Sequence, residues 1–158
     1  MEKEITEVYC GNGRGKTTLA IGQALRASSQ GKSVIIIQFL KGNERRELDF
    51  LEELDQLDIK IFRFEKMETC YDQLNEEEQV EEERNILNGL NFARKVIATQ
   101  ECDFLVLDEI LGLLDKHIAT VDMVVGLLKQ KDESMHLILT GNRVDPGILD
   151  YVDSVTTI

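Results

Sequence analysis

The chain has 158 residues, the length of one domain, so we expect residues 1–158 to fold as a single domain. Apolar residues make up 42% and charged residues 30% of the sequence, which is enough for a sizeable core and argues against general disorder. The net charge of -12 argues against a protein that mainly binds nucleic acid or an anionic membrane, although a local cluster of backbone N–H groups can still bind a small anion.

The sequence predicts a cytoplasmic protein. No apolar run approaches the roughly 20 residues of a membrane-spanning helix. The start Met-Glu-Lys-Glu carries three charged residues and leads straight into a short strand-like run, so we expect that it is not a signal peptide. Cys10, Cys70 and Cys102 are widely spaced and form no CxxC pair. Three isolated cysteines are more typical of a reduced compartment than of a disulfide scaffold or a zinc site.

Short apolar runs alternate with segments of helical periodicity along the chain. The apolar runs predict strands at residues 5–9, 34–39, 59–64, 104–107, 136–140 and 154–158. The periodic segments predict helices at residues 17–29, 43–54, 75–98, 121–131 and 145–151. Because this alternation joins parallel strands by crossovers, we expect an α/β fold with an open, mostly parallel sheet and helices on both faces.

The longest predicted helix covers residues 75–98. Asn75 is its candidate N-cap, and the three glutamates that follow stand where the helix dipole favours negative charge. Its expected apolar stripe consists of Val80, Ile86, Leu87, Leu90, Ala93, Val96 and Ile97. This stripe favours a solvated helix face for the acidic run 76–83 over a partner-binding tail.

The segment 10–18 is the most specific motif in the sequence. It reads Cys-Gly-Asn-Gly-Arg-Gly-Lys-Thr-Thr between a predicted strand and a predicted helix, which is the context of a phosphate-binding loop. Its glycines permit positive φ angles and close approach of an anion, and the helix N-terminus adds positive potential. Cys10 stands where the usual pattern has its first glycine, and a glycine-rich turn without a ligand is the alternative.

This loop supplies candidate ligands for phosphate and for magnesium. The ammonium of Lys16 would bind the phosphates, and the hydroxyl of Thr17 would hold a magnesium ion. Arg14 either adds a phosphate contact or points to solvent. The nucleotide-binding candidates on the loop are Gly11, Asn12, Gly13, Arg14, Gly15, Lys16, Thr17 and Thr18.

A second part of the predicted site is the apolar strand that ends in Asp108 and Glu109. In a phosphate-loop protein such a strand lies beside the loop, and its acid binds magnesium directly or through water. Both acids would face the ligand crevice at the carboxyl edge of the sheet, and the sequence does not decide which is nearer to the metal. The alternative is a charged helix start after a core strand.

Two further segments end strands at the same predicted edge. Gln38 closes an apolar strand and needs a hydrogen-bond partner, which favours a place near the nucleotide over a structural amide. Residues 140–143, Thr-Gly-Asn-Arg, either contact the phosphate or base or form a plain turn. His117 and His136 have no metal-ligand spacing, and we expect them on the surface or packed in the structure.

These motifs resemble the P-loop family of ATP:corrinoid adenosyltransferases. The resemblance is carried by residues 9–18, 22–27, 38–42 (Gln-Phe-Leu-Lys-Gly), 106–109 and 139–141, and it covers nearly the whole chain. It implies a RecA-like P-loop NTPase fold. It also implies an enzyme of adenosylcobalamin synthesis, in which the cobalt(I) of a reduced corrinoid attacks the 5′ carbon of ATP and triphosphate leaves.

The resemblance also assigns roles to residues and names partners. ATP would bind in a reversed sense, with its triphosphate on Gly13, Gly15, Lys16, Thr17 and Thr18. The implied magnesium ligands are Thr17, Asp108 and Glu109, and the catalytic candidates are Lys16, Thr17 and Glu109. ATP and a corrinoid are the implied substrates and Mg²⁺ the cofactor, with a cobalt reductase and a second copy of the chain as candidate partners.

The sequence departs from the family pattern in three places. It contains no Trp, so Tyr71 is the only aromatic residue near the family's corrinoid-facing Phe and Trp, and the roles of Tyr71 and Cys70 stay open. Asn142 replaces the usual Arg after Thr-Gly, and no basic tail follows Ile158. Two alternatives therefore remain: a nucleotide-binding homologue that senses or regulates without adenosylating, and a generic P-loop ATPase or kinase.

Overall fold

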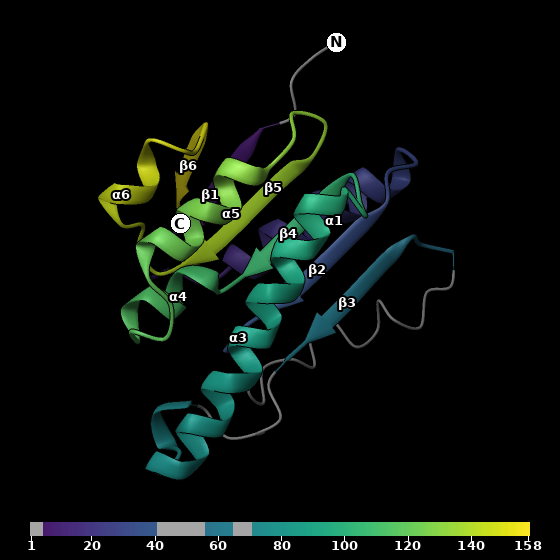
Figure 1. The fold of residues 1–158 in the computed structure, drawn as a ribbon. Coiled ribbons are helices and arrows are strands. Elements are labelled where there is room, and N and C mark those ends of the chain that lie inside the picture. The colour runs from purple at the N-terminus through teal and green to yellow at the C-terminus, as the bar shows by residue number, and fades with distance from the viewer. Residues whose placement is uncertain (1–4, 41–55, 65–70) are drawn as a thin grey trace.

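The computed structural model describes residues 5–40, 56–64 and 71–158 (Figure 1). Its strands are β1 (Thr6–Cys10), β2 (Val34–Gln38), β3 (Ile59–Arg63), β4 (Phe104–Asp108), β5 (His136–Gly141) and β6 (Ser154–Thr157). Its helices are α1 (Lys16–Ser29), α3 (Glu76–Thr99), α4 (Ile110–Asp115), α5 (Val121–Gln130) and α6 (Pro146–Leu149), with a 3₁₀ turn η2 (Tyr71–Gln73). The helix predicted at 43–54 lies outside the described residues.

The six described strands form one sheet in the order β3-β2-β4-β5-β1-β6, and every neighbouring pair is parallel. The predicted α/β fold with a parallel sheet is confirmed. All carboxyl ends therefore meet at one edge of the sheet, where ligands bind in such folds. The register pairs Gln38 with Asp108 and Cys10 with Gly141, so the predicted site motifs end neighbouring strands.

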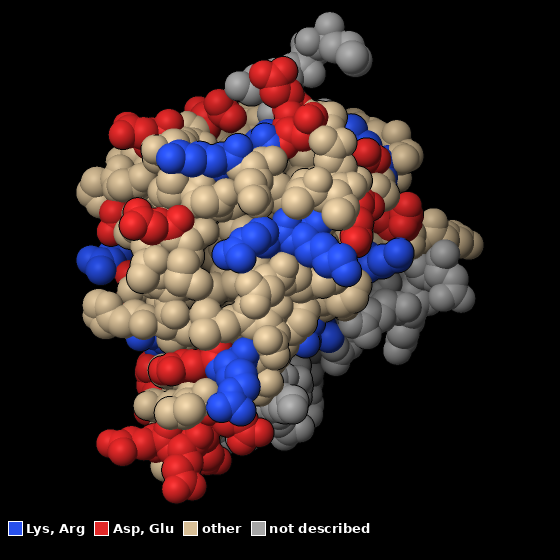
Figure 2. Space-filling model, in the orientation of Figure 1, with Lys and Arg blue, Asp and Glu red and all other residues tan. Residues whose placement is uncertain are grey.

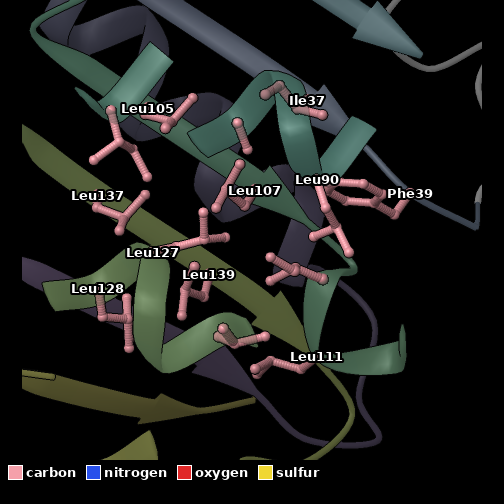
Figure 3. Close-up of a cluster of buried hydrophobic side chains, with 14 of the residues drawn as sticks. Ile37, Phe39, Leu90, Leu105, Leu107, Leu111, Leu127, Leu128, Leu137 and Leu139 are labelled. Carbon is pink, nitrogen blue, oxygen red and sulfur yellow. The ribbon is translucent and has the colours of Figure 1, made fainter. Parts of the chain in front are cut away.

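Helices cover both faces of this sheet, as predicted (Figure 1). On one face, α1 packs Ala20, Ala24 and Ala27 against a cluster that includes Ile36 and Val106. On the other face, α3, α4 and α5 cover Ile35, Ile37, Leu105, Leu107, Leu137 and Leu139 (Figure 3). Strand side chains alternate between the two faces, and because both faces are buried the strands read as continuous apolar runs.

Helix α3 begins as the sequence predicts, with Asn75 as its N-cap. The Asn75 side-chain oxygen accepts a hydrogen bond from the Glu78 N–H at 2.9 Å. Glu78 Oε1 in turn accepts one from the Asn75 N–H at 3.1 Å. This reciprocal capping box satisfies two backbone donors and fixes where the helix starts.

The apolar stripe predicted for α3 is only partly buried. Val80 is 57% exposed and Leu87 36% exposed, whereas the other members are buried: Ile86, Leu90, Ala93, Val96 and Ile97. The first turns of α3 project past the carboxyl edge of the sheet, so the stripe loses its cover there (Figure 1). Figure 2 shows acidic side chains gathered on this projecting end. The predicted solvated acidic face is wrong at Glu82, which is buried and accepts a hydrogen bond from Asn85 Nδ2 at 3.1 Å.

The sequence did not predict α4, which follows β4 after a single residue. Its six residues are too few to show a helical period, although Ile110, Leu111 and Leu113 are all buried. In the described ranges no helix is long and apolar enough to cross a bilayer.

Candidate functional site

The predicted phosphate loop connects β1 to α1 at the carboxyl edge of the sheet. Gly11 and Gly15 have φ angles of 124° and 108°, in the left-handed region that other residues rarely adopt. Gly15 is also the N-cap of α1, and it has no side chain to cap the first-turn N–H groups. The start of α1 therefore offers backbone donors and the positive end of a helix dipole, which together favour an anion.

Two of the loop glycines also allow another backbone segment to approach. A Cβ on Gly11 would lie 2.2 Å from the carbonyl oxygen of Ile158, and one on Gly13 would lie 2.8 Å from it. The Gly13 N–H donates a hydrogen bond to this carbonyl at 3.0 Å, and the Ile158 N–H donates to Cys10 O at 2.7 Å. Positions 11 and 13 therefore need glycine because the backbone of Ile158 packs against them. The motif alone does not reveal this long-range contact.

Lys16 lies at the first position of α1 with its ammonium turned back over the loop. Nζ donates hydrogen bonds to Gly11 O at 2.7 Å and to Asn142 Oδ1 at 2.9 Å. The residue is 9% exposed. The ammonium thus spans the loop between its first glycine and the residue that follows β5.

Asp108 ends β4 and is a hydrogen-bonding centre that is only 1% exposed. Its Oδ1 accepts from Thr17 Oγ1 at 3.0 Å and from Thr140 Oγ1 at 2.7 Å. Its Oδ2 accepts from Gln38 Nε2 at 3.2 Å. The structure therefore brings together Thr17 of the loop, the acid of β4 and the end of β2, although they are far apart in the sequence.

Gln38 connects this acid to Arg63, a residue that no sequence motif had indicated. Arg63 ends β3, pairs with Gln38 in the register and donates from Nε to Gln38 Oε1 at 3.1 Å. The available signal was that an arginine closes an apolar strand at the same edge as the other site residues. The amide is both hydrogen-bonded and adjacent to the site acid, so the two interpretations of Gln38 do not exclude each other.

Glu109, the second predicted acid, is the N-cap of α4 and has a φ of 64°. Its backbone N–H donates to the Thr140 hydroxyl at 2.8 Å. Its Oε2 lies 3.3 Å from the place that a Cβ on Gly112 would take. Asp108 contacts Thr17 directly, since it accepts from the Thr17 hydroxyl at Oδ1 at 3.0 Å and at Oδ2 at 3.2 Å. A metal-binding role for Glu109 stays a prediction.

The remaining predicted loop residues are exposed on the surface. They are Asn12, Gly13, Arg14, Gly15 and Thr18. Arg143, an open candidate after β5, is also exposed and donates from Nε to Asp115 Oδ1 at 2.8 Å.

Tyr71 lies in η2 beside the projecting start of α3. Its hydroxyl donates to Glu83 Oε1 at 2.5 Å, and Lys116 Nζ lies 5.9 Å from its ring centroid. Burial, followed by the hydrogen bond to Glu83, raises the pKa of Tyr71 to about 12. Tyr71 therefore holds η2 to α3 and to the end of α4, and Cys70 lies outside the described residues.

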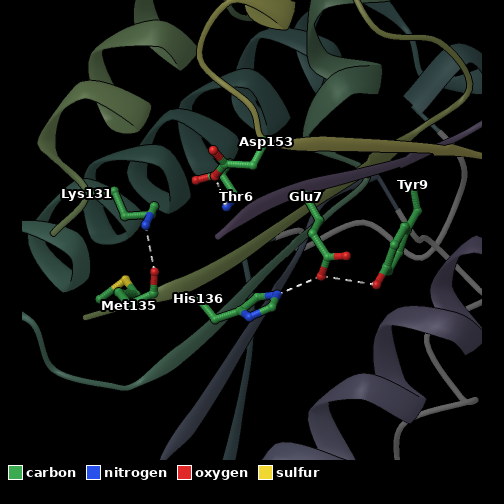
Figure 4. A network of polar contacts seen from close by, with 7 residues as sticks. All are labelled: Thr6, Glu7, Tyr9, Lys131, Met135, His136 and Asp153. Atoms are coloured by element: carbon green, nitrogen blue, oxygen red, sulfur yellow. Dashed lines mark hydrogen bonds and ion pairs between the residues drawn. The ribbon is translucent and has the colours of Figure 1, made fainter. Parts of the chain in front are cut away.

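His136 belongs to a separate network, formed by β1 and the first residue of β5 (Figure 4). Its Nε2 lies 2.6 Å from Glu7 Oε2, and its ring stacks on Phe104 with centroids 4.6 Å apart. Tyr9 donates to the same carboxylate at 3.4 Å. His117 is exposed at the end of α4. His136 thus packs between strands, away from the phosphate loop.

Two described cysteines are free and buried, Cys10 and Cys102. Burial raises the pKa of the Cys102 thiol to about 12. Cys10 Sγ lies 3.8 Å from Thr157 Oγ1. A buried thiol with a raised pKa is a poor nucleophile, so Cys102 is a packing residue.

Fold and site together define the class of protein. The class is marked by a parallel sheet, a Gly-Lys-Thr loop between β1 and α1, and a strand-end acid that contacts the loop hydroxyl. A solved KaiC-like protein from the hyperthermophilic archaeon Pyrococcus horikoshii is similar, with a TM-score of 0.63 and 19% identity, over 98% of this chain and 72% of that one. At this identity the likeness bears on the fold, and the predicted P-loop NTPase fold is confirmed.

Sequence comparisons then give the family. A profile of the family described as ATP:corrinoid adenosyltransferase BtuR/CobO/CobP matches residues 2–158. The corrinoid adenosyltransferase of Escherichia coli K12 is 30% identical over 162 residues, covering 99% of this chain and 77% of that protein. The one from Salmonella typhimurium is 28% identical over 160 residues with the same coverage. The chain belongs to the ATP:corrinoid adenosyltransferase family, as the resemblance of its motifs predicted.

Proposed function

We propose that this site transfers the 5′-deoxyadenosyl group of ATP to the cobalt(I) of a reduced corrinoid and releases triphosphate. The observation that carries the proposal is the contact of the loop hydroxyl Thr17 with Asp108, beside Lys16, in a chain of this family. In the reaction, cobalt(I) donates an electron pair to C5′ and becomes cobalt(III). The C5′–O bond breaks, and triphosphate leaves with the bonding pair.

The proposed role of the protein is to position the substrates and stabilise charge. Since the corrinoid supplies the nucleophile, no side chain has to act as a base. Lys16 and the N–H groups at the start of α1 would bind the triphosphate and stabilise the charge that develops on it as it leaves. Holding C5′ in line with the cobalt would supply the remaining acceleration.

Thr17 and Asp108 fit a magnesium ion, because hydroxyl and carboxylate oxygens are the ligands that it prefers. The donor set is already assembled, with Thr17 Oγ1 3.0 Å from Asp108 Oδ1. Thr17 would hold the ion, Asp108 would orient Thr17, and Glu109 is a further candidate ligand. Bound there, magnesium would neutralise part of the triphosphate charge.

The wider setting is also a proposal. We infer one domain over residues 1–158, a cytoplasmic location, a cobalt reductase as electron donor and a homodimer. The buried free thiols of Cys10 and Cys102 support a reducing compartment. The reductase and the second copy rest on the family resemblance.

The test is to identify the phosphate product with and without reduced corrinoid under anaerobic conditions. The proposed enzyme releases triphosphate only when MgATP and reduced corrinoid are both present. A sensor would bind MgATP and release nothing, and an ATPase would release orthophosphate without corrinoid. Either of these two results, obtained with both a complete and an incomplete corrinoid, would contradict the proposal.

A further inference from the structure

Asn142 contacts both ends of the phosphate loop from the neighbouring strand. It follows β5 directly, and the register that pairs Cys10 with Gly141 places it beside Gly11. Its backbone carbonyl accepts a hydrogen bond from the Gly11 N–H at 2.8 Å, and its Oδ1 accepts one from Lys16 Nζ at 2.9 Å. An ammonium only donates hydrogen bonds, so the amide oxygen rather than the amide nitrogen must face Lys16.

The acceptors of the Lys16 ammonium are both uncharged. They are Gly11 O at 2.7 Å and Asn142 Oδ1 at 2.9 Å, and an ammonium has three donors. Two neutral acceptors fix the direction of the ammonium without neutralising its charge. Among the described residues, the full charge and one donor are therefore left for a phosphate.

The neighbouring arginine does not share this role. Arg143 is 80% exposed at its side chain and donates from Nε to Asp115 Oδ1 at 2.8 Å. The turn after β5 thus presents an amide to the loop lysine and directs the cation next to it toward α4. A cationic side chain at position 142 could not accept the hydrogen bond from Lys16.

We propose that Asn142 is a positioning residue for the triphosphate. Its side-chain oxygen directs the Lys16 ammonium toward the phosphates, while its backbone carbonyl holds the loop at Gly11. The inference rests on the proposed function in one respect, since it takes triphosphate as the ligand of the loop. Because the side chain acts through Lys16, it sets the affinity for triphosphate.

The test is a double-mutant cycle of Asn142→Ala with Lys16→Ala in the full chain. Calorimetric titration without corrinoid would give the affinities for MgATP and for inorganic tripolyphosphate with magnesium. Asn142→Ala should weaken both ligands by the same factor, roughly tenfold, the size of one charge-assisted hydrogen bond. In the Lys16→Ala background the same substitution should change either affinity by less than about twofold. An equal loss without Lys16, or no loss with it, would overturn the proposal.

Two further variants separate positioning from folding. Arg143→Ala is the matched control, because it removes the pair with Asp115 and leaves the loop contacts in place. Its affinities should match those of the unaltered chain, and a tenfold loss there would assign the effect to the turn and overturn the proposal. Asn142→Asp keeps the shape but pairs a carboxylate with Lys16, so it should weaken triphosphate binding more than Asn142→Ala does. Binding at or above the unaltered affinity would contradict the proposal.

These binding results are independent of the transfer reaction, because no corrinoid is present. If the double-mutant cycle gives the expected affinities but the unaltered chain does not adenosylate a corrinoid, only the proposed function would be contradicted. Thermal unfolding of each variant would show that the comparisons are made on folded protein.

Discussion

At the scale of single residues, the site depends on polar groups that are buried and held by hydrogen bonds. Asp108 is 1% exposed and accepts hydrogen bonds from three side chains. Lys16 is 9% exposed, and its ammonium donates to one backbone carbonyl and one side-chain amide oxygen. Burial of a charge costs free energy unless hydrogen bonds or an opposite charge compensate it. Lys16 has only neutral acceptors among the described residues, so a bound phosphate would supply its missing counter-charge.

Removal of this ammonium should abolish tight nucleotide binding while the fold survives. We expect Lys16→Ala to weaken MgATP binding by roughly 100-fold, the upper range for a hydrogen bond to a charged group. Calorimetric titration would measure the loss, and thermal unfolding would check the fold. Lys95→Ala, an exposed lysine on α3, is the matched control and should leave the affinity unchanged. Equal affinities for Lys16→Ala and the control would remove the loop from the nucleotide site.

Two tyrosines should make stability fall in alkaline solution. Burial is the largest cause that raises the pKa of both Tyr9 and Tyr71 to about 12, whereas unfolded phenols titrate near pH 10. The folded state therefore binds these protons more tightly, so their contribution is complete below about pH 10 and is lost as the pH rises to about 12.

Urea unfolding across this pH range would test the assignment. The unaltered chain should lose stability between about pH 10 and pH 12, and the double variant Tyr9→Phe with Tyr71→Phe should lose less. An identical pH dependence in the double variant would show that folding does not raise the pKa of these two phenols.

At the scale of elements, close packing between helix and strand sets the shape of the site edge. Helix α4 lies so near the end of β5 that a Cβ on Gly141 would come within 2.4 Å of Leu111 Cβ. Gly126, in the middle of α5, has no atom within 4 Å of the same hypothetical Cβ. The two glycines therefore differ in environment although neither has a positive φ.

The pair Gly141→Ala and Gly126→Ala should have opposite effects on stability. We expect Gly141→Ala to lower the free energy of unfolding by about 1–3 kcal/mol, because an overpacked contact forces a shift. Gly126→Ala should raise it by about 0.5–1 kcal/mol, since alanine has the better helix propensity. Denaturant unfolding measures both. A neutral Gly141→Ala would mean that α4 does not lie this close to β5.

At the scale of the whole molecule, the features that could be predicted are those determined by residues adjacent in the sequence. The loop 10–18 and the strand ending in Asp108 each combine local motif and local context, so the sequence identified both. The parallel sheet followed from alternating strands and helices, and the sheet then placed the two motifs at one edge.

The features that the sequence missed depend on contacts between distant segments. Arg63 joins the site only because β3 pairs with β2 next to Gln38. Asn142 was already an open candidate in the segment 140–143, but its contact with Lys16 could not be predicted because it arises only where β5 lies beside β1. Glu82 is buried where periodicity predicted a solvated face, because tertiary packing decides which side of α3 is covered.

The most direct test of the account is an anaerobic mixture of the protein, MgATP and chemically reduced cobalamin, followed by the cobalt(I) absorbance. We predict that the cobalt(I) signal disappears as adenosylcobalamin and triphosphate form in equal amounts. We also predict that Lys16→Ala slows this loss severely at the same protein concentration. Persistent cobalt(I) absorbance with MgATP demonstrably bound, for cobalamin and for an incomplete corrinoid alike, would contradict adenosyl transfer as the function of this site.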